Sequence, residues 1–136
     1  MRPRVLILDS DTASRLALVA TLRDRFQVLP PDSTQPAVRR VRAEQPALVL
    51  VVLGRRRDPH PLRTARVLKT DARPPSVGVI DPWGKARPDE LEAVDGVWRG
   101  EPDADICGWS RQVLAGEHPV VERPLRRSLL RRLLST

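Results

Sequence analysis

The fold that this sequence predicts is decided by residues 46–54, which read PALVLVVLG. This is the longest purely apolar run in the chain. A strand built from it would have two apolar faces, which is typical of a central strand in a parallel sheet covered by helices on both sides. The run is too short to cross a membrane as a helix, which takes ~20 residues. Pro46 closes whatever helix precedes the strand, and Gly54 opens a loop.

Short apolar stretches alternate with amphipathic ones along the rest of the chain. The apolar stretches predict further strands at residues 4–8, 26–29, 76–80 and 97–99. The amphipathic stretches predict helices at residues 13–25, 37–45 and 62–69, a short helix between residues 88 and 95, and a last helix that follows Pro102 and Asp103 and ends at Ala115. Five β-α pairs in succession predict a doubly wound (βα)5 fold, in which helices cover both faces of a five-stranded parallel sheet.

Residues 117–136 follow the expected domain, which we place at residues 1–116. Pro119 and Pro124 make the first half of this tail a linker, and residues 125–134, LRRSLLRRLL, have the spacing of a short basic amphipathic helix. Such a helix needs a surface to pack on, because isolated helices shorter than ~12–15 residues rarely hold in water. The tail arginines that we expect to contact a partner are Arg126, Arg127, Arg131 and Arg132.

The residue types also exclude several classes of protein. A single cysteine, Cys107, excludes an internal disulfide and a cysteine cluster for a metal. The first residues lack the length and the cleavage site of a signal peptide, so we expect a cytoplasmic protein. The sequence contains no nucleophile elbow, phosphate-binding glycine loop or zinc-ligand spacing. We therefore expect a chain of 136 residues to form one domain that is not an enzyme and holds no cofactor.

The charge of the chain leaves two explanations open. Basic residues outnumber acidic ones by 24 to 17, and all of them except Lys69 and Lys85 are arginine. A net charge of +7 attracts nucleic acid or an acidic protein face, but it can equally reflect an arginine-rich proteome. Aromatic residues make up only 3% of the chain, which disfavours a platform that stacks single-stranded nucleic acid. A basic nucleic-acid-binding regulator is therefore the alternative function.

The β-α pattern and three stretches of sequence resemble the receiver domain of bacterial two-component response regulators. The stretches are VLILD at residues 5–9, PALVLVV at residues 46–52 and VDGVW at residues 94–98. The resemblance covers roughly residues 4–116 and implies a flavodoxin-like fold with a role in signal transduction. Receivers phosphorylate themselves on an aspartate after strand three. An acidic pair holds Mg²⁺, and a hydroxyl and a lysine stabilise the phosphoryl oxygens.

Carried onto this sequence, the resemblance implies a pocket that has lost most of these groups. Asp9 matches the first acid, but Ser10 stands in place of the second, with Asp11 beside it. Val52 occupies the phosphoacceptor position, and a valine cannot accept a phosphoryl group. The resemblance thus implies a degenerate receiver, or pseudo-receiver, with no catalytic residue. The hydroxyl and the lysine would stand at Ile80 or Asp81 and at Gly100 or Glu101.

Two groups of charged residues each have two interpretations. Asp9 and Asp11 could hold a divalent cation or could cap the first helix. One retained acid supplies too few carboxylate ligands for Mg²⁺, so we expect these residues to cap the helix and to hold no metal. The run Arg55, Arg56 and Arg57 falls at the edge where doubly wound folds bind ligands, which makes it an anion-binding candidate. A solvated basic loop is the other interpretation of this run.

Trp98 and Trp109 are the candidate anchors for a protein partner. In receivers, helix four, strand five and helix five form the usual dimer and partner face, and the resemblance places both tryptophans there. Exposed tryptophans would anchor a partner or a second copy, whereas buried ones would fill the core or seal the sheet edge. The spacing of Ile106, Trp109 and Val113 favours the core for Trp109, and both interpretations stay open for Trp98. The predicted function is phosphorylation-independent signalling through protein–protein contacts.

Overall fold

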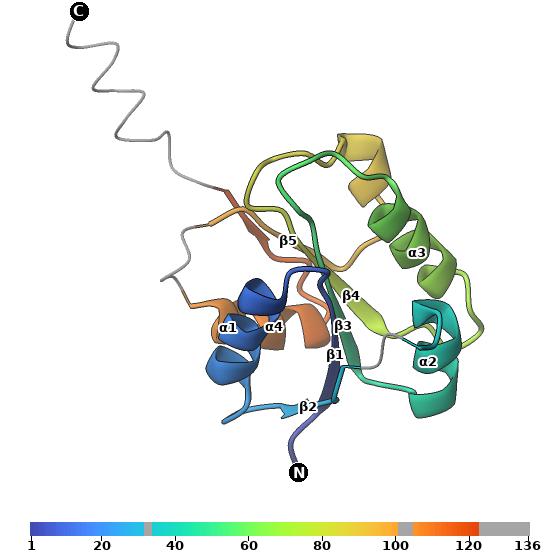
Figure 1. The fold of residues 1–136 in the computed structure, drawn as a ribbon, viewed down its shortest axis with the longest axis vertical. Coiled ribbons are helices and arrows are strands. Elements are labelled where there is room, and N and C mark those ends of the chain that lie inside the picture. The colour runs from blue at the N-terminus through green and yellow to red at the C-terminus, as the bar shows by residue number, and fades with distance from the viewer. Residues whose placement is uncertain (32–33, 101–104, 123–136) are drawn as a thin grey trace, which may run out of the picture.

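The computed structural model describes residues 1–31, 34–100 and 105–122. All strands in this part of the chain run parallel, in the order β2-β1-β3-β4-β5-β6, and helices cover both faces of the sheet (Figure 1). The strands are β1 (Arg4–Leu8), β2 (Gln27–Val28), β3 (Leu48–Val52), β4 (Ser76–Ile80), β5 (Gly96–Trp98) and β6 (Val120–Val121). The α-helices are α1 (Thr12–Leu22), α2 (Ala37–Glu44), α3 (His60–Lys69) and α4 (Ile106–Leu114).

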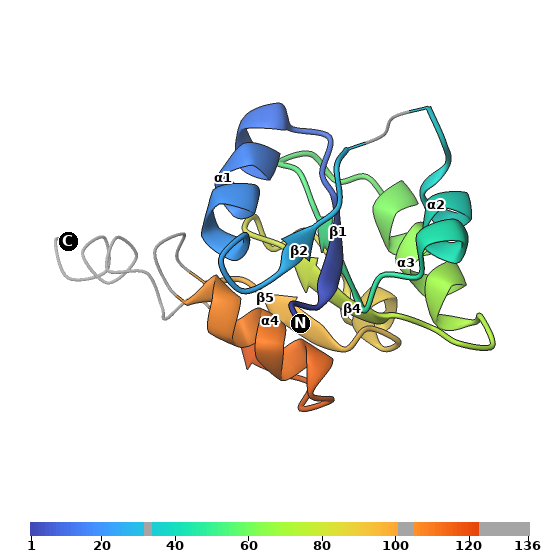
Figure 2. The same ribbon diagram turned by 90° about the horizontal axis from the view of Figure 1, so that it is seen from below.

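Strand β3 is the central strand that the apolar run predicts. It pairs with β1 on one side and with β4 on the other. Leu48, Val49, Leu50 and Val51 are each 0% exposed, because helices lie over both faces of the strand. Figure 2 shows α1 and α4 on one side of the sheet and α2 and α3 on the other. The doubly wound parallel architecture is therefore confirmed.

The helix expected between residues 88 and 95 is reduced to a single 3-10 turn, η1 (Pro88–Leu91). The loop between β4 and η1 has a non-helical backbone that is fixed at both ends. Pro82 and Pro88 have no N–H to donate, and Gly84 adopts a left-handed φ of 62°. Asp95 is already fixed to β4, because its N–H donates to the carbonyl oxygen of Val77 at 2.8 Å. Between these fixed points the chain forms the single 3-10 turn of η1.

The prediction of five strands is wrong, because part of the expected linker joins the sheet as β6. Gly116, with φ of 76°, ends α4 and turns the chain back toward the sheet. The N–H of Val97 then donates to the carbonyl oxygen of Pro119 at 3.0 Å, and that of Arg99 to Val121 at 2.7 Å. Strand β6 thereby covers the edge of β5, and the folded unit extends past residue 116.

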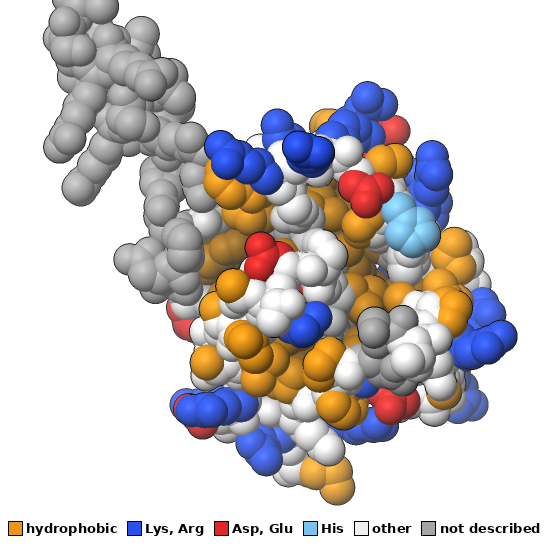
Figure 3. Space-filling view, viewed as in Figure 1, with side chains coloured by type: hydrophobic (Ala, Val, Ile, Leu, Met, Phe, Trp, Pro, Cys, Tyr) orange, Lys and Arg blue, Asp and Glu red, His pale blue; other side chains and the backbone are white. Residues whose placement is uncertain are grey.

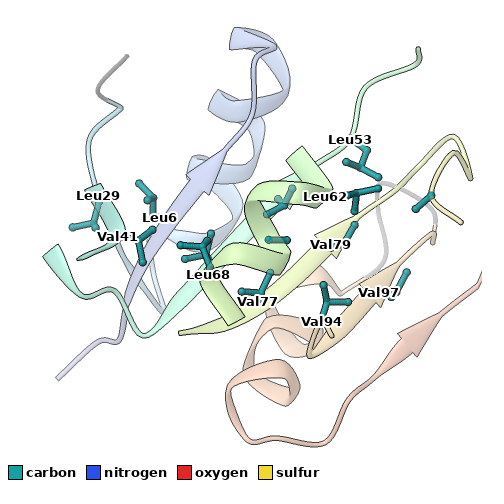
Figure 4. Packing of buried hydrophobic residues seen from close by; sticks show 14 residues of the cluster. Leu6, Leu29, Val41, Leu53, Leu62, Leu68, Val77, Val79, Val94 and Val97 are labelled. Atoms are coloured by element: carbon teal, nitrogen blue, oxygen red, sulfur yellow. The ribbon is translucent and has the colours of Figure 1, made fainter. Parts of the chain in front are cut away.

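The core lies in two layers, one on each face of the sheet. On the α2 and α3 face, Leu62 and Leu68 of α3 pack against Val77 and Val79 of β4 (Figure 4). On the α1 and α4 face, the largest buried side chain is Trp109, which lies across β4 and β5. A Cβ atom on Gly78 would come within 2.7 Å of the Trp109 ring, so only glycine lets α4 approach the sheet this closely.

Candidate functional site at the carboxyl edge of the sheet

The carboxyl ends of the parallel strands meet at one edge of the sheet, at the top of Figure 1. Across this edge, Val52 of β3 pairs in register with Ile80 of β4, and Ile80 pairs with Trp98 of β5. All three side chains pack into the core layer on the α1 and α4 face. The resemblance places a phosphate acceptor in this row, at Val52. The row is instead apolar, so it offers no nucleophile and no phosphate ligand.

The acidic residues after β1 serve the start of α1. Asp11 is the N-cap of α1, and its carboxylate accepts a hydrogen bond from the N–H of Ser14 at 3.1 Å. The carboxylate of Asp9 accepts from the N–H of Asp11 at 2.9 Å through Oδ1, and its Oδ2 is buried without a hydrogen-bond partner among the described residues. Within the described ranges, no three His, Cys, Asp or Glu side chains gather as metal ligands would.

Asp81, directly after β4, is fully buried and is held by three donors. Its carboxylate accepts from the backbone N–H of Lys85 at 2.8 Å and of Ala86 at 3.0 Å. The third donor is Nε of Arg99, at 3.1 Å, which makes an ion pair across the ends of β4 and β5. A buried carboxylate needs this compensation, because burial of an unpaired charge is very costly. Asp81 is therefore engaged inside the fold.

Arg99 joins this buried carboxylate to the last described residues of the chain. Its guanidinium also donates to the carbonyl oxygen of Ala86 at 3.2 Å and to Glu122 Oε1 at 3.3 Å. Because Arg99 and Glu122 follow β5 and β6 directly, the same side chain holds the ends of three strands together. The sequence analysis did not single out Arg99. The sequence did contain a signal for this pair: an acidic residue, Asp81, follows one predicted strand, and a basic residue, Arg99, ends the next one.

The arginine run after β3 is exposed, but its three side chains have different surroundings. Arg55 lies over the ring of Trp83, 5.3 Å from the ring centroid. Arg57 makes a bidentate ion pair with Glu90, at 2.8 and 3.0 Å. Arg56 lines a cavity of about 230 Å³ together with Arg57 and Lys85. In Figure 3, Lys and Arg side chains gather at the top of the molecule, over these loops.

The ion pair of Arg57 and Glu90 has a marked electrostatic effect. The hydrogen bonds from Arg57, and next the one from the N–H of Arg87, lower the pKa of Glu90 to about 2. The same bonds raise the pKa of Arg57 above its usual value. Glu90 therefore stays ionised in the folded protein at pH values where a free glutamate would be protonated. This pair ties the loop after β3 to η1.

The structure buries both candidate partner anchors. Trp98 is 5% exposed and Trp109 is 2% exposed, and their rings meet edge to face with centroids 5.7 Å apart. The indole N–H of Trp109 donates to the carbonyl oxygen of Pro119 at 3.3 Å. Both tryptophans therefore fill the core and seal the edge of the sheet, and neither is exposed as an anchor for a partner. Trp83, which the sequence analysis did not propose as an anchor, is 48% exposed.

The remaining expected site residues are separated from one another or lie outside the described part of the chain. Gly100 is buried beside the Trp98 ring and Val121. Glu101 and the tail arginines lie outside the described residues. Lys85, beside the 230 Å³ cavity, was also missed, because nothing in the sequence shows that the loop after β4 folds back toward the arginine run. Among the described helices, none is long and apolar enough to cross a membrane.

Two larger hollows lie at the opposite edge of the sheet. One of about 540 Å³ lies below the amino ends of β3 and β4, and one of about 730 Å³ surrounds Met1 and Arg111. Arg42 and Asp71 line the first, but they pair with each other at 2.9 Å. Polar groups that converge on a ligand are a better mark of a site than volume. The smaller cavity at the carboxyl edge is therefore the better candidate.

No protein-family model and no curated protein matches this sequence. Solved structures do share its fold. A response regulator from Thermotoga maritima has a TM-score of 0.54 and 19% identity, with 99% of this chain and 97% of that chain covered. A response regulator receiver domain (CheY-like) from Methylobacillus flagellatus has a TM-score of 0.60 and 14% identity, covering 99% and 98%. The chain therefore has the flavodoxin-like receiver fold.

Proposed function

We propose that this chain is a signalling regulator that keeps the receiver fold and acts through protein–protein contacts without phosphorylation of an aspartate. The observation that carries the proposal is the apolar row of Val52, Ile80 and Trp98 across the carboxyl ends of β3, β4 and β5. Phosphoryl transfer to a protein needs a nucleophilic oxygen, and the side chain of Val52 has no lone pair.

The ion pair behind this row supports the same proposal. The oxygens of Asp81 accept from Lys85, Ala86 and Arg99, so this carboxylate is not free to attack phosphorus. Asp11 is engaged at the start of α1. In this proposal the protein acts as a binding module and not as an enzyme.

The partner surface that we propose is the exposed pair of Arg55 and Trp83. Arginine and tryptophan are the residue types most enriched among the energetically dominant residues of interfaces. The pair stands on two loops at the carboxyl edge, whereas Trp98 and Trp109 are buried and β6 covers the outer edge of β5. The positive charge of the arginine run fits an acidic protein surface.

We favour a protein partner over nucleic acid because the exposed pair joins an arginine to a tryptophan, two residue types that are enriched in protein interfaces. In the described part of the chain, ion pairs to acidic side chains engage five basic residues. These residues are Arg40, Arg42, Arg57, Lys69 and Arg99. These five cations could follow a phosphate backbone only by breaking their ion pairs.

Fluorescence anisotropy of a labelled peptide rich in glutamate and aspartate tests this function with the full chain. We expect binding that does not change after incubation with acetyl phosphate and Mg²⁺ followed by desalting. The variants R55A and W83A should weaken the binding, and R73A at the opposite edge should not. Binding that arises only after acetyl phosphate contradicts the proposal. Tighter and steeply salt-dependent binding to duplex DNA would favour the nucleic-acid alternative.

A further inference from the structure

We propose that the cavity at the carboxyl end of β3 is a reversible binding site for a small anion of the phosphate type. The cavity has a volume of about 230 Å³. It lies between the loop after β1, the arginine run and the loop after β4. The residues that line it include Ser10, Val52, Gly54, Arg56, Arg57 and Lys85.

The charged groups around this cavity are mostly cationic. Arg56, Arg57 and Lys85 line it, and the only acid among its lining residues is Asp58. The Oδ1 atom of Asp58 accepts from the N–H of His60 at 3.0 Å, which fixes the turn into α3. Arg57 is held by Glu90, so its charge is largely compensated. The excess positive charge therefore comes from Arg56 and Lys85.

The side chains of Arg56 and Lys85 are both exposed, and neither makes a hydrogen bond or an ion pair with any described residue. The backbone of Lys85 is nevertheless well fixed. Its N–H donates to buried Asp81 at 2.8 Å, and its carbonyl oxygen accepts from Arg57 at 2.8 Å. Two free cationic groups thus stand on loops that other contacts hold in place, which lowers the cost of ordering them around a ligand.

The main chain adds donors to the same place. The backbone N–H groups of Gly54, Arg56 and Arg57, which line the cavity, donate to no acceptor in the described ranges. Ser10 contributes a hydroxyl. Free backbone N–H groups that border a cavity are hydrogen-bond donors for an anion. A cavity with several donors and one engaged acid therefore suits an anion whose oxygens mainly accept hydrogen bonds, such as phosphate.

The neighbouring carboxylates do not oppose an anion. Asp81 is neutralised by Arg99 at 3.1 Å, and Asp9 lines a different cavity, between β1 and the start of α2. Val52 places no charge at the cavity. A volume of about 230 Å³ is below the ~300–1,000 Å³ of pockets for drug-sized ligands, which favours a phosphate group alone over a nucleotide. The site goes beyond the proposed function, because it uses neither Trp83 nor Arg55 and forms no covalent bond.

Titration of the ¹⁵N-labelled full chain with inorganic phosphate, at an ionic strength held constant with sodium chloride, tests this site. We expect saturable shifts of the amide signals of Gly54, Arg56 and Lys85. Each of the variants R56A and K85A should weaken binding about tenfold or more, the effect of losing one charge-assisted hydrogen bond. The control R73A removes the same charge from an exposed loop at the opposite edge and should leave the affinity within about twofold.

Three results would overturn the proposal. One is the absence of saturable shifts. Another is an equal loss of affinity in R73A, which would indicate attraction to net charge alone. The third is a set of shifts that lies away from the loops after β3 and β4. Because dialysis reverses the binding and the protein mass does not change, failure here leaves the proposed function untouched, and the converse also holds.

Discussion

At the scale of single residues, Asp81 organises the carboxyl edge of the sheet. Its three donors come from the loop after β4 and from the end of β5. The sequence places Asp81 at the end of a strand, at one of the two positions where the resemblance would put a hydroxyl. It does not show that Arg99 would turn toward it. Such pairing depends on the distance between two strands, which only the assembled sheet defines.

Replacing Asp81 tests this role. D81A removes the acceptor of two backbone N–H groups and one of the acceptors of Arg99, and breaking a buried pair costs about 3–5 kcal/mol. D71A breaks the exposed pair with Arg42 and should cost about 0–1 kcal/mol. Urea unfolding of both variants measures the difference. Equal losses in the two variants would contradict the role given to Asp81.

The pair of Arg57 and Glu90 predicts an effect of acid. The pKa of Glu90 is lowered from 4.5 to about 2 in the folded protein. Its contribution to stability is therefore fully present above pH 4.5 and is lost as the pH falls toward 2. E90Q should remove this component, so that the variant loses less stability than the parent chain between pH 5 and pH 3. Unfolding curves at the two pH values measure it, and parallel losses would contradict the prediction.

At the scale of elements, Gly78 in β4 determines how closely α4 can pack. A Cβ atom there would meet the Trp109 ring at 2.7 Å and Leu50 at 3.1 Å. G78A should therefore destabilise the protein by about 1–3 kcal/mol through overpacking. G54A is the matched control, because no atom lies within 4 Å of the added methyl group. Denaturant unfolding followed by tryptophan fluorescence compares them. A G78A variant as stable as G54A would disprove this packing.

Strand β6 predicts that the folded unit includes residues beyond Gly116. A chain cut after Gly116 loses the partner of β5, the acceptor of the Trp109 indole and the contact of Arg99 with Glu122. A chain cut after Glu122 keeps all three. We expect the shorter chain to have the lower melting temperature and faster amide exchange in β5. Identical melting of the two chains would favour the boundary at residue 116.

The sequence predicts a helix or strand well where the hydrophobic pattern extends over many residues, and poorly where it extends over two or three. The apolar run of β3 and the strand at residues 76–80 follow from composition alone. A two-residue strand such as β6 carries no period, and it becomes a strand only because the free edge of β5 lies beside it. The shortened helix at η1 depends on Asp81 capturing two N–H groups of its own loop, which is a tertiary contact.

At the scale of the whole molecule, the receiver fold is present and the row at the ends of its central strands is apolar. Hydrophobic packing of the two core layers sets this architecture, and it does so without any of the polar groups that phosphoryl transfer requires. The fold could be predicted because it rests on burial. The candidate site could be predicted only in part, since its cations come from loops whose approach the sequence does not encode locally.

Intact-mass spectrometry of the full chain after incubation with acetyl phosphate and Mg²⁺ tests the central claim most directly. A receiver that has an aspartate at the end of its third strand serves as the positive control in the same buffer. The account predicts an unchanged mass for this protein, because Val52 occupies the acceptor position. The addition of one phosphoryl group, mapped by fragmentation to an aspartate, would contradict it.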